Sequence, residues 1–176
     1  MNILEIFTNS ILLIITLDNE LWDIILLSLF VSFTALIIAS LLGFIVGYFF
    51  AIYNFYFKKI ILIIINSLMG IPPVVVGLIV YFIFASGGPL GILQLLYTPS
   101  AMIIAQTIII FPIIASLSHE IFSKNWFEFK DQIRSLNIPF WGSVKLLFNH
   151  SYFLLITTLL SAFGRAISEV GAVMIV

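Results

Sequence analysis

The stretch from Ile24 to Ala51, IILLSLFVSFTALIIASLLGFIVGYFFA, contains no charged residue. A helix of this length, rising about 1.5 Å per residue, can cross a hydrocarbon layer of about 30 Å even when it is tilted. The rest of the chain agrees, because 62% of its 176 residues are hydrophobic, only 9% are charged and the mean hydropathy is +1.27. So few charges cannot cover the surface of a soluble domain. We therefore expect an all-α integral membrane protein.

The composition excludes several other kinds of protein. The chain has no cysteine, so disulfides, thiolate metal sites and a cysteine nucleophile are all absent. Its net charge of −1 does not supply the basic field that nucleic-acid binding needs. The two histidines, His119 and His150, have no second ligand at metal-binding spacing, and we expect a solvated or interfacial role for His119. We accordingly expect no nucleic-acid partner, no metal and no catalytic residue.

Three further apolar stretches predict three more spans, at residues 60–84, at residues 100–118 and from Leu146 to the end of the chain. About four transmembrane helices result. Ahead of them, residues 1–22 carry apolar positions at helical spacing, but the run between Glu5 and Asp18 is short for a span. We interpret residues 1–22 as an interfacial helix, with a tilted span as the alternative, and residues 23–176 as the membrane domain.

Small residues recur along the first span, and such stripes let another helix approach closely within lipid. The stripe consists of Ser32, Ala35, Ala39, Gly43 and Gly47. It predicts a helix contact face.

The basic residues predict the orientation of the chain. Six of the seven flank two of the loops, whereas the loop at residues 86–99 has none. These six are Lys58, Lys59, Lys124, Lys130, Arg134 and Lys145. Loops rich in Lys and Arg stay on the cytoplasmic side, so the prediction is a multi-pass protein of the cytoplasmic (inner) membrane with its N-terminus outside.

The polar segment 123–145 carries one apolar stripe with steps of 3, 4, 3 and 4 residues, which predicts an amphipathic helix. The stripe consists of Trp126, Phe129, Ile133, Leu136 and Phe140. Asn137 tolerates the left-handed conformation at a helix end, and Pro139 can begin a new helix. We expect a short helix, a bend and a second helix that enters the membrane. Without a partner, the same stripe would rest on the lipid surface.

Three segments carry a resemblance to a known family. Residues 131–141, DQIRSLNIPFW, resemble the EAA loop of ABC importer permeases, with Asp131 in place of its Glu and Asn137 in place of its Gly. Residues 68–78, LMGIPPVVVGL, resemble the Pro-Pro-Val-Val-Gly stretch of molybdate and tungstate permeases, and residues 164–172, GRAISEVGA, resemble their Arg-Ala-x-x-Glu-x-Gly-Ala signature. Of these family members, the tungstate permeases are the ones whose signature is most similar to residues 164–172. His150 falls near a position where the family usually has Pro.

The resemblance implies a helix bundle like that of type I ABC importer permeases, passing an oxyanion, tungstate first and molybdate next. The chain would be a transport subunit and no enzyme, and ATP would bind only to a separate cytoplasmic ABC ATPase. A second permease copy, forming a homodimer, and an extracytoplasmic oxyanion-binding protein are further implied partners. Because relatives continue beyond the apolar ending at Val176, we also expect one further span that this chain lacks.

The resemblance also assigns two sets of residues. ATPase coupling would use the segment 128–141, with Asp131, Ile133, Arg134, Leu136, Asn137, Pro139, Phe140 and Trp141. The translocation path would use Gly70, Pro72, Pro73, Arg165, Ser168, Glu169 and Gly171. Within the path, the prolines leave backbone carbonyls without partners and could shape a gate or merely a packed kink.

Two other functions stay open at this level. Arg165 and Glu169 are four residues apart, so they can form an ion pair on one helix face, either as part of an anion path or as a structural pair. Alternatively, Glu169 could couple ions in a secondary carrier. An intramembrane hydrolase is the weaker alternative, because the candidate pair His150 and Ser151 lacks an elbow motif.

Overall fold

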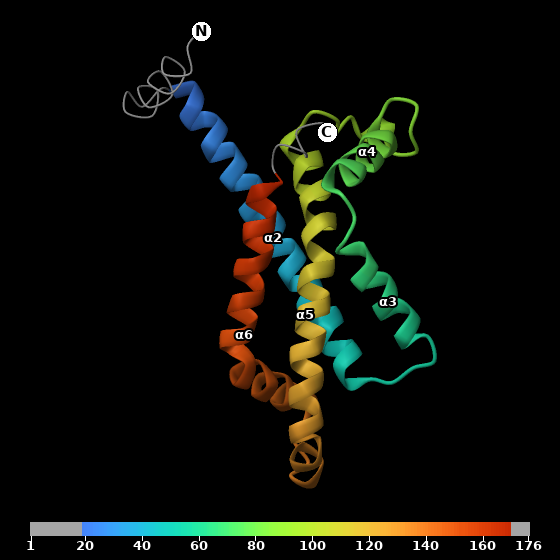
Figure 1. Cartoon of the computed structure of the whole chain (residues 1–176), viewed down its shortest axis with the longest axis vertical. Coiled ribbons are helices and arrows are strands. Elements are labelled where there is room, and N and C mark those ends of the chain that lie inside the picture. Colours follow the sequence, from blue (N-terminus) through green and yellow to red (C-terminus); the bar gives the residue numbers. More distant parts are fainter. Residues whose placement is uncertain (1–18, 170–176) are drawn as a thin grey trace.

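The structure is a computed structural model that describes residues 19–169; residues 1–18 and 170–176 lie outside the described part. The described residues form helices and no strand, which confirms the all-α membrane class (Figure 1). The elements are α2 (Asn19–Ile52), α3 (Lys58–Leu68), α4 (Pro73–Phe84), a short 3-10 turn η1 (Gly91–Leu93), α5 (Pro99–Ser135) and α6 (Phe140–Ser168). Of the predicted interfacial segment, residues 19–22 form the first turn of α2, and the remainder lies outside the described residues.

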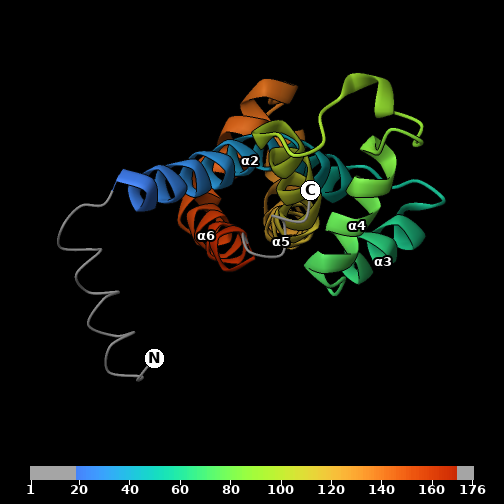
Figure 2. The same ribbon diagram turned by 90° about the horizontal axis from the view of Figure 1, so that it is seen from above.

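Helix α5 is the central element of the bundle. It packs against α2 and α6, and α3 and α4 also contact it (Figures 1 and 2). Viewed from above, α6 and the α3–α4 pair lie on different sides of α5 (Figure 2). A buried apolar core joins these helices, including Ala35 of α2, Val80 of α4, Ile110 of α5 and Ala162 of α6.

The small-residue stripe of α2 is the surface that meets α5, as predicted. A Cβ atom on Gly43 would lie 2.7 Å from Cγ2 of Ile114, and one on Gly47 would lie 2.9 Å from the backbone nitrogen of His119. Both separations are shorter than a Cβ atom tolerates to a non-bonded neighbour, so only glycine permits this approach. At the same contact, the Ser118 hydroxyl donates a hydrogen bond to the carbonyl of Gly43 at 3.2 Å. The rest of the stripe is also buried, namely Ser32, Ala35 and Ala39.

Three helices are long and apolar enough to cross a membrane, over Leu21–Ile52, Pro99–Ser135 and Phe140–Ser168. The predicted span at residues 60–84 forms two helices, α3 and α4, which are bent by 103° where the sequence places Gly70, Pro72 and Pro73. The pair is a fourth span only if it is counted as one broken unit. The bend arises because Pro72 disfavours helix at the residue before it and lacks an N–H to continue α3. Pro73 then begins α4, a position where proline is favourable.

The predicted span at residues 100–118 and the predicted amphipathic helix are one continuous helix. Helix α5 has 37 residues, which corresponds to about 55 Å and exceeds the thickness of a hydrocarbon layer. Separate helices were therefore the wrong expectation. No glycine or proline interrupts residues 113–135, so nothing in the local sequence stops the helix where its charged half begins.

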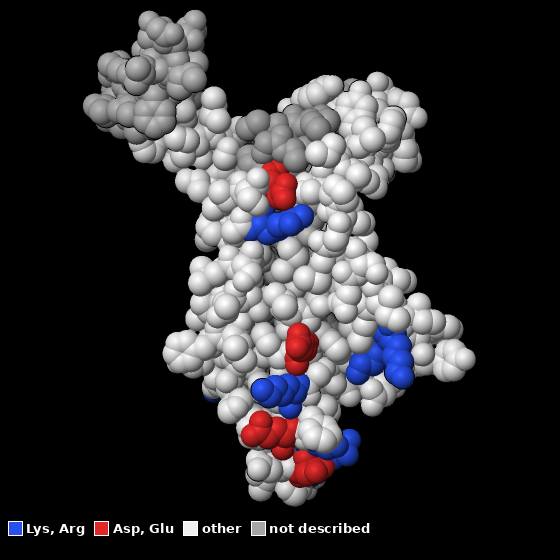
Figure 3. All heavy atoms as spheres, viewed as in Figure 1, with Lys and Arg blue, Asp and Glu red and all other residues white. Residues whose placement is uncertain are grey.

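Most charged side chains on the face shown in Figure 3 gather at one end of the molecule. An uncharged belt separates them from one further group, a red patch beside a blue one, in the upper half (Figure 3). The α2–α3 connection and the α5–α6 turn both lie at this charged end, whereas residues 85–98 lie at the opposite end (Figure 1). The tertiary structure therefore brings the two basic loops to the same end of the bundle.

Candidate functional site

The turn between α5 and α6 is fixed by backbone hydrogen bonds. Asn137 adopts a left-handed conformation, with φ of 49°. The amide of Ile138 donates to the carbonyl of Ile133 at 3.0 Å, and that of Asn137 donates to Arg134 at 3.1 Å. This pair of bonds is the Schellman motif that closes helix C-termini. Pro139 follows in an extended conformation, and α6 begins at the next residue. The bend predicted from Asn137 and Pro139 is confirmed.

The predicted apolar stripe divides into a buried and an exposed part. Trp126 and Phe129 pack partly buried against the chain's own core. Ile133 is 5% exposed and is covered by the chain itself. The resemblance implies that Ile133 is an anchor in an ATPase groove. This role is wrong for Ile133, because a side chain already covered within the chain has no face to offer a partner. Its main contribution is to hold the turn.

The exposed part lies at the turn itself. Leu136 is 71% and Trp141 77% exposed, and Phe140 is also exposed on one side. Asp131 and Arg134, at the end of α5, are exposed beside them. The structure therefore brings these five predicted residues together at the charged end of the molecule, on a turn whose backbone is fixed by Asn137 and Pro139.

One residue that the sequence did not single out, Tyr48, connects this turn to α2. Its ring packs edge-on against Phe140 and Phe122, with centroid distances of 5.8 Å and 5.6 Å. Its hydroxyl donates to the Ser143 hydroxyl at 3.4 Å. The signal in the sequence was a tyrosine within an apolar span, because a buried tyrosine hydroxyl needs a hydrogen-bond partner. Its packing gives α2 a direct contact with the first turn of α6.

The second group of predicted residues lies at the α3–α4 bend. A hollow of about 290 Å³ is lined by Met69 and Ile71 of the bend, by Pro112 of α5 and by Arg165 of α6. The predicted path residues Gly70, Pro72 and Pro73 shape this bend, and their neighbours line the hollow. Ser168 is exposed, and its hydroxyl donates to the carbonyl of Arg165 at 2.9 Å. Gly171 lies outside the described residues.

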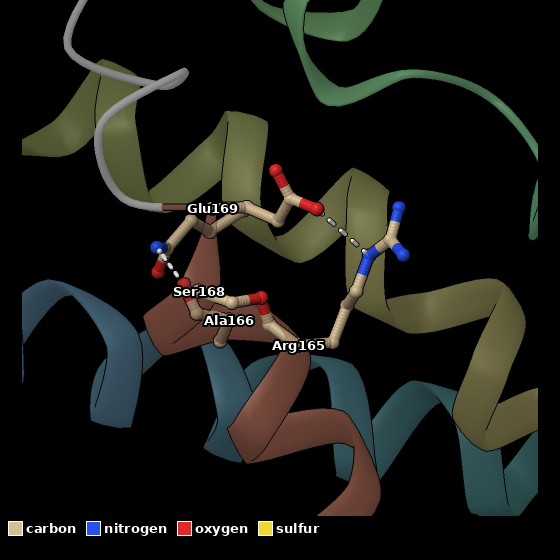
Figure 4. Close-up of polar contacts among 5 residues, drawn as sticks. Arg165, Ala166, Ser168 and Glu169 are labelled. Carbon is tan, nitrogen blue, oxygen red and sulfur yellow. Dashed lines mark hydrogen bonds and ion pairs between the residues drawn. The ribbon is translucent and has the colours of Figure 1, made fainter.

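Arg165 and Glu169 form the predicted ion pair. Their side chains point toward each other, with Nε of Arg165 3.4 Å from Oε1 of Glu169 (Figure 4). It is the one ion pair within 4.0 Å among the side chains that the structure describes. Arg165 is the one charged residue that lines the hollow, whose other walls are mainly apolar. A guanidinium group keeps its charge and offers several N–H donors, which suits it to bind an oxyanion.

Proline 112 adds a second polar feature to the same hollow. It lies inside α5 and has no N–H, so the carbonyl of Ile108, four residues earlier, loses its helical partner. Ile108 lines the hollow together with Thr107, whose hydroxyl donates to the carbonyl of Ile103 at 2.7 Å. The hollow is thus lined by a guanidinium group and by a residue whose carbonyl lacks its helical N–H donor.

Gln106, which sequence reasoning also missed, fastens the end of α6. It is 1% exposed, and its Nε2 donates to the carbonyl of Ala166 at 2.9 Å. That carbonyl belongs to the last turn of α6, where no helical N–H is available. Gln106 on α5 therefore fixes the backbone next to Arg165. An amide within an apolar run was the signal for this role.

The residues of the hydrolase alternative are not brought together. The Ser151 hydroxyl is buried and accepts a hydrogen bond from Asn125, while the ring of His150 packs edge-on against Phe129 with centroids 4.7 Å apart. His119 is half-buried and shares a hydrogen bond of 3.1 Å with Ser123. The candidate pair His150 and Ser151 is therefore not arranged as a base beside a serine nucleophile.

Comparisons with known proteins identify the relatives. No protein-family model matches the chain. The tungstate uptake system permease protein TupB of Peptoclostridium acidaminophilum is 38% identical over 174 residues, which is 99% of this chain and 76% of that protein. A probable anion ABC transporter permease of Haloferax volcanii is 36% identical over 85% of this chain and 64% of that protein. TupB of Campylobacter jejuni is 36% identical over 70% of this chain and 52% of its own length.

The bundle and its long apolar helices indicate a multi-pass membrane protein. The identity with these relatives specifies the kind: the chain belongs to the oxyanion permease family of ABC transporters, among the proteins related to the tungstate uptake permeases. The resemblance stated from its three motifs is thereby confirmed.

Proposed function

We propose that this permease subunit passes tungstate, with molybdate as the second choice, into the cytoplasm. Two of the relatives are named as tungstate uptake permeases, which favours tungstate. The observation that carries the anion path is Arg165, which lines an otherwise apolar hollow at the α3–α4 bend. Glu169 neutralises the guanidinium while no anion is present, and an arriving oxyanion competes with it.

The exposed turn couples this path to a separate ABC ATPase. Leu136, Phe140 and Trp141 present apolar surface beyond the uncharged belt, at the end of the molecule that carries the basic residues. Apolar and aromatic side chains of this kind anchor protein interfaces. Asp131 and Arg134 add polar contacts that fix the register, and Asn137 and Pro139 hold the shape of the turn. ATP is bound and hydrolysed by the ATPase, and this chain holds no cofactor.

The fixed turn also transmits motion. Phe140 contacts Tyr48 of α2, and Ile133 is buried beneath the turn, so a displacement of the turn moves both α2 and α6. Helix α6 carries Arg165 at its other end, about 38 Å away along a helix of this length. Helix α6, which changes direction after its first turns (Figure 1), therefore links the ATPase contact with the arginine of the path without a break.

The orientation in the membrane is inferred from the charge pattern, and the partners are inferred from the class of ABC transporter permeases. The end with six basic residues faces the cytoplasm, and the N-terminus lies outside the cytoplasmic membrane. Two permease copies form a homodimer that completes the path. An extracytoplasmic oxyanion-binding protein delivers the anion at the opposite end.

A secondary carrier built on Glu169 is the competing function. It gains nothing from an exposed apolar turn at the charged end, and its coupling residue is already paired with Arg165. The decisive experiment is uptake of radioactive tungstate into vesicles that contain the permease and its ATPase. Uptake that requires ATP and continues in uncoupler supports the importer; uptake that stops with uncoupler and ignores ATP supports the carrier.

A further inference from the structure

A second hollow, of about 300 Å³, lies at the charged end between the α2–α3 connection and α5. Three cationic residues line it: Lys58 from α3, and Lys130 and Arg134 from α5. None of its lining residues is acidic. Lys130 and Arg134 lie one helical turn apart, and Ser123 lies two turns before Lys130, so these residues share one face of α5. The hollow is therefore a basic one, built from segments far apart in the sequence.

The three cations have no carboxylate partner in the described part of the chain, where Arg165–Glu169 is the one ion pair within 4.0 Å. Lys58 donates to Oδ1 of Asn54 at 3.2 Å, and the ammonium group of Lys130 lies 4.7 Å from the ring centroid of Phe127. Both contacts leave the positive charge in place. Three like charges around one hollow repel each other, and a bound anion removes that repulsion.

The acidic residues of α5 lie on a different face of the helix from the residues that line the basic hollow. Glu120 and Glu128 line a different hollow, together with Lys124 and His150. One face of α5 thus carries both acidic and basic residues, whereas the charged residues on the other face are all basic. The basic face is the one directed toward the last turn of α2, where Ala51 and Ile52 end a membrane span.

This position indicates which anion fits. The hollow lies where a span ends, and its wall includes Trp126, a residue type that favours the headgroup level of a bilayer. Basic pockets between helices on the cytoplasmic side bind phospholipid headgroups. Arginine matches two phosphate oxygens at once, lysine adds point charges, and the Ser123 hydroxyl can donate as well. A free cytoplasmic ion would find the charges but would gain nothing from the apolar rim.

We propose that the hollow formed by Lys58, Lys130 and Arg134 binds the phosphate headgroup of an anionic membrane phospholipid. The bound headgroup joins the α2–α3 connection to α5, just above the turn that is proposed to contact the ATPase. The inference goes beyond the transport function and needs only that this end of the bundle lies at a membrane surface. Lipid retention can be measured whether or not the protein carries tungstate.

The test is native mass spectrometry of the permease complex purified from nanodiscs that contain equal amounts of phosphatidylglycerol and phosphatidylcholine. The variant is the double substitution Lys58→Gln with Lys130→Gln. The matched control is Lys59→Gln with Lys145→Gln, which removes two exposed positive charges outside the hollow. We expect the variant to retain about tenfold less phosphatidylglycerol than the wild type and the control to retain the wild-type amount.

Two further measurements keep the test decisive. Arg134→Gln alone should also lower phosphatidylglycerol retention; because Arg134 is also a proposed ATPase contact, this variant is compared with wild type in permease freed of its ATPase and is checked for an unchanged unfolding temperature. Equal retention in variant and control would overturn the proposal, because the charges would then act only as a general surface field. Displacement of the lipid by millimolar inorganic phosphate or tungstate, with binding of that ion to lipid-free protein, would overturn the lipid assignment in favour of a free-oxyanion site.

Discussion

The ring of Tyr48 in α2 packs edge-on against the ring of Phe140, the first residue of α6, with centroids 5.8 Å apart. The two residues are separated by about half of the chain, and their contact links α2 to the exposed turn. The buried hydroxyl of Tyr48 also reaches Ser143. A motion of the turn must therefore move α2 or break this aromatic contact.

Two substitutions at Tyr48 distinguish the contribution of its ring to stability from that of its hydroxyl. Tyr48→Phe removes one long hydrogen bond and should cost no more than about 1 kcal/mol of unfolding free energy. Tyr48→Ala removes the ring contacts and should cost about 3 to 5 kcal/mol. Thermal unfolding in detergent measures both. The ring would not be the element that links α2 to the turn if Tyr48→Ala unfolded at the wild-type temperature.

Leu136 tests the ATPase contact. It is largely exposed, so Leu136→Asp should leave the permease folded. In an ATPase groove the new carboxylate would lie buried without a partner, and ATPase recovery on co-purification should fall at least about tenfold. Tyr56→Asp is the control, because Tyr56 is 92% exposed in the α2–α3 connection at the same end. Equal ATPase recovery from Leu136→Asp and Tyr56→Asp, at equal permease abundance, would refute the coupling role of the turn.

Arg165 tests the anion path. Arg165→Gln removes the charge from the hollow and should lower tungstate uptake at least about tenfold, because an anion entering an apolar hollow then has no counter-charge. Arg165→Lys should restore part of the uptake. Co-purification of the ATPase should stay at the wild-type level in both variants, since the residue lies at the other end of α6. If Arg165→Gln took up tungstate at the wild-type rate, the ion pair of Arg165 with Glu169 would have a structural role only.

Gly47 tests the α2–α5 contact. Gly47→Ala places a Cβ atom 2.9 Å from the backbone nitrogen of His119, and backbone cannot move aside cheaply. We expect a loss of about 1 to 3 kcal/mol in unfolding free energy. Gly164→Ala is the matched control, because Gly164 also lies in a spanning helix but has no atom within 4 Å of the added Cβ. A lower unfolding temperature for both variants would indicate a general intolerance of glycine replacement rather than a close helix contact.

Cysteine labelling tests the orientation. The chain contains no cysteine, so single substitutions at Gly87 and Gln132 give unique labels on exposed positions at opposite ends. An impermeant maleimide added to intact cells should label Gly87→Cys and spare Gln132→Cys until the membrane is opened. Labelling in the reverse pattern would place the basic end outside, and the ATPase contact at the turn would have to be abandoned.

The sequence by itself determined the class, the number of apolar stretches and the shape of the α5–α6 turn. Long uncharged runs are stable in lipid and not in water, which determines the class. Asn137 and Pro139 restrict the backbone of the turn through their own φ preferences. The small-residue stripe likewise predicted a close helix contact. These features are local, because they depend on residues within a few positions of one another.

Only the tertiary structure decided which surfaces stay free and which distant residues meet. Ile133 and Leu136 belong to one periodic stripe, yet the first is covered by the chain and the second is exposed. Arg165 lies beside the α3–α4 bend, and Gln106 reaches the carbonyl of Ala166, through the packing of α5 and α6. Periodicity shows that a face is apolar but not which neighbour covers it, because that depends on how far each helix extends and where it crosses the next.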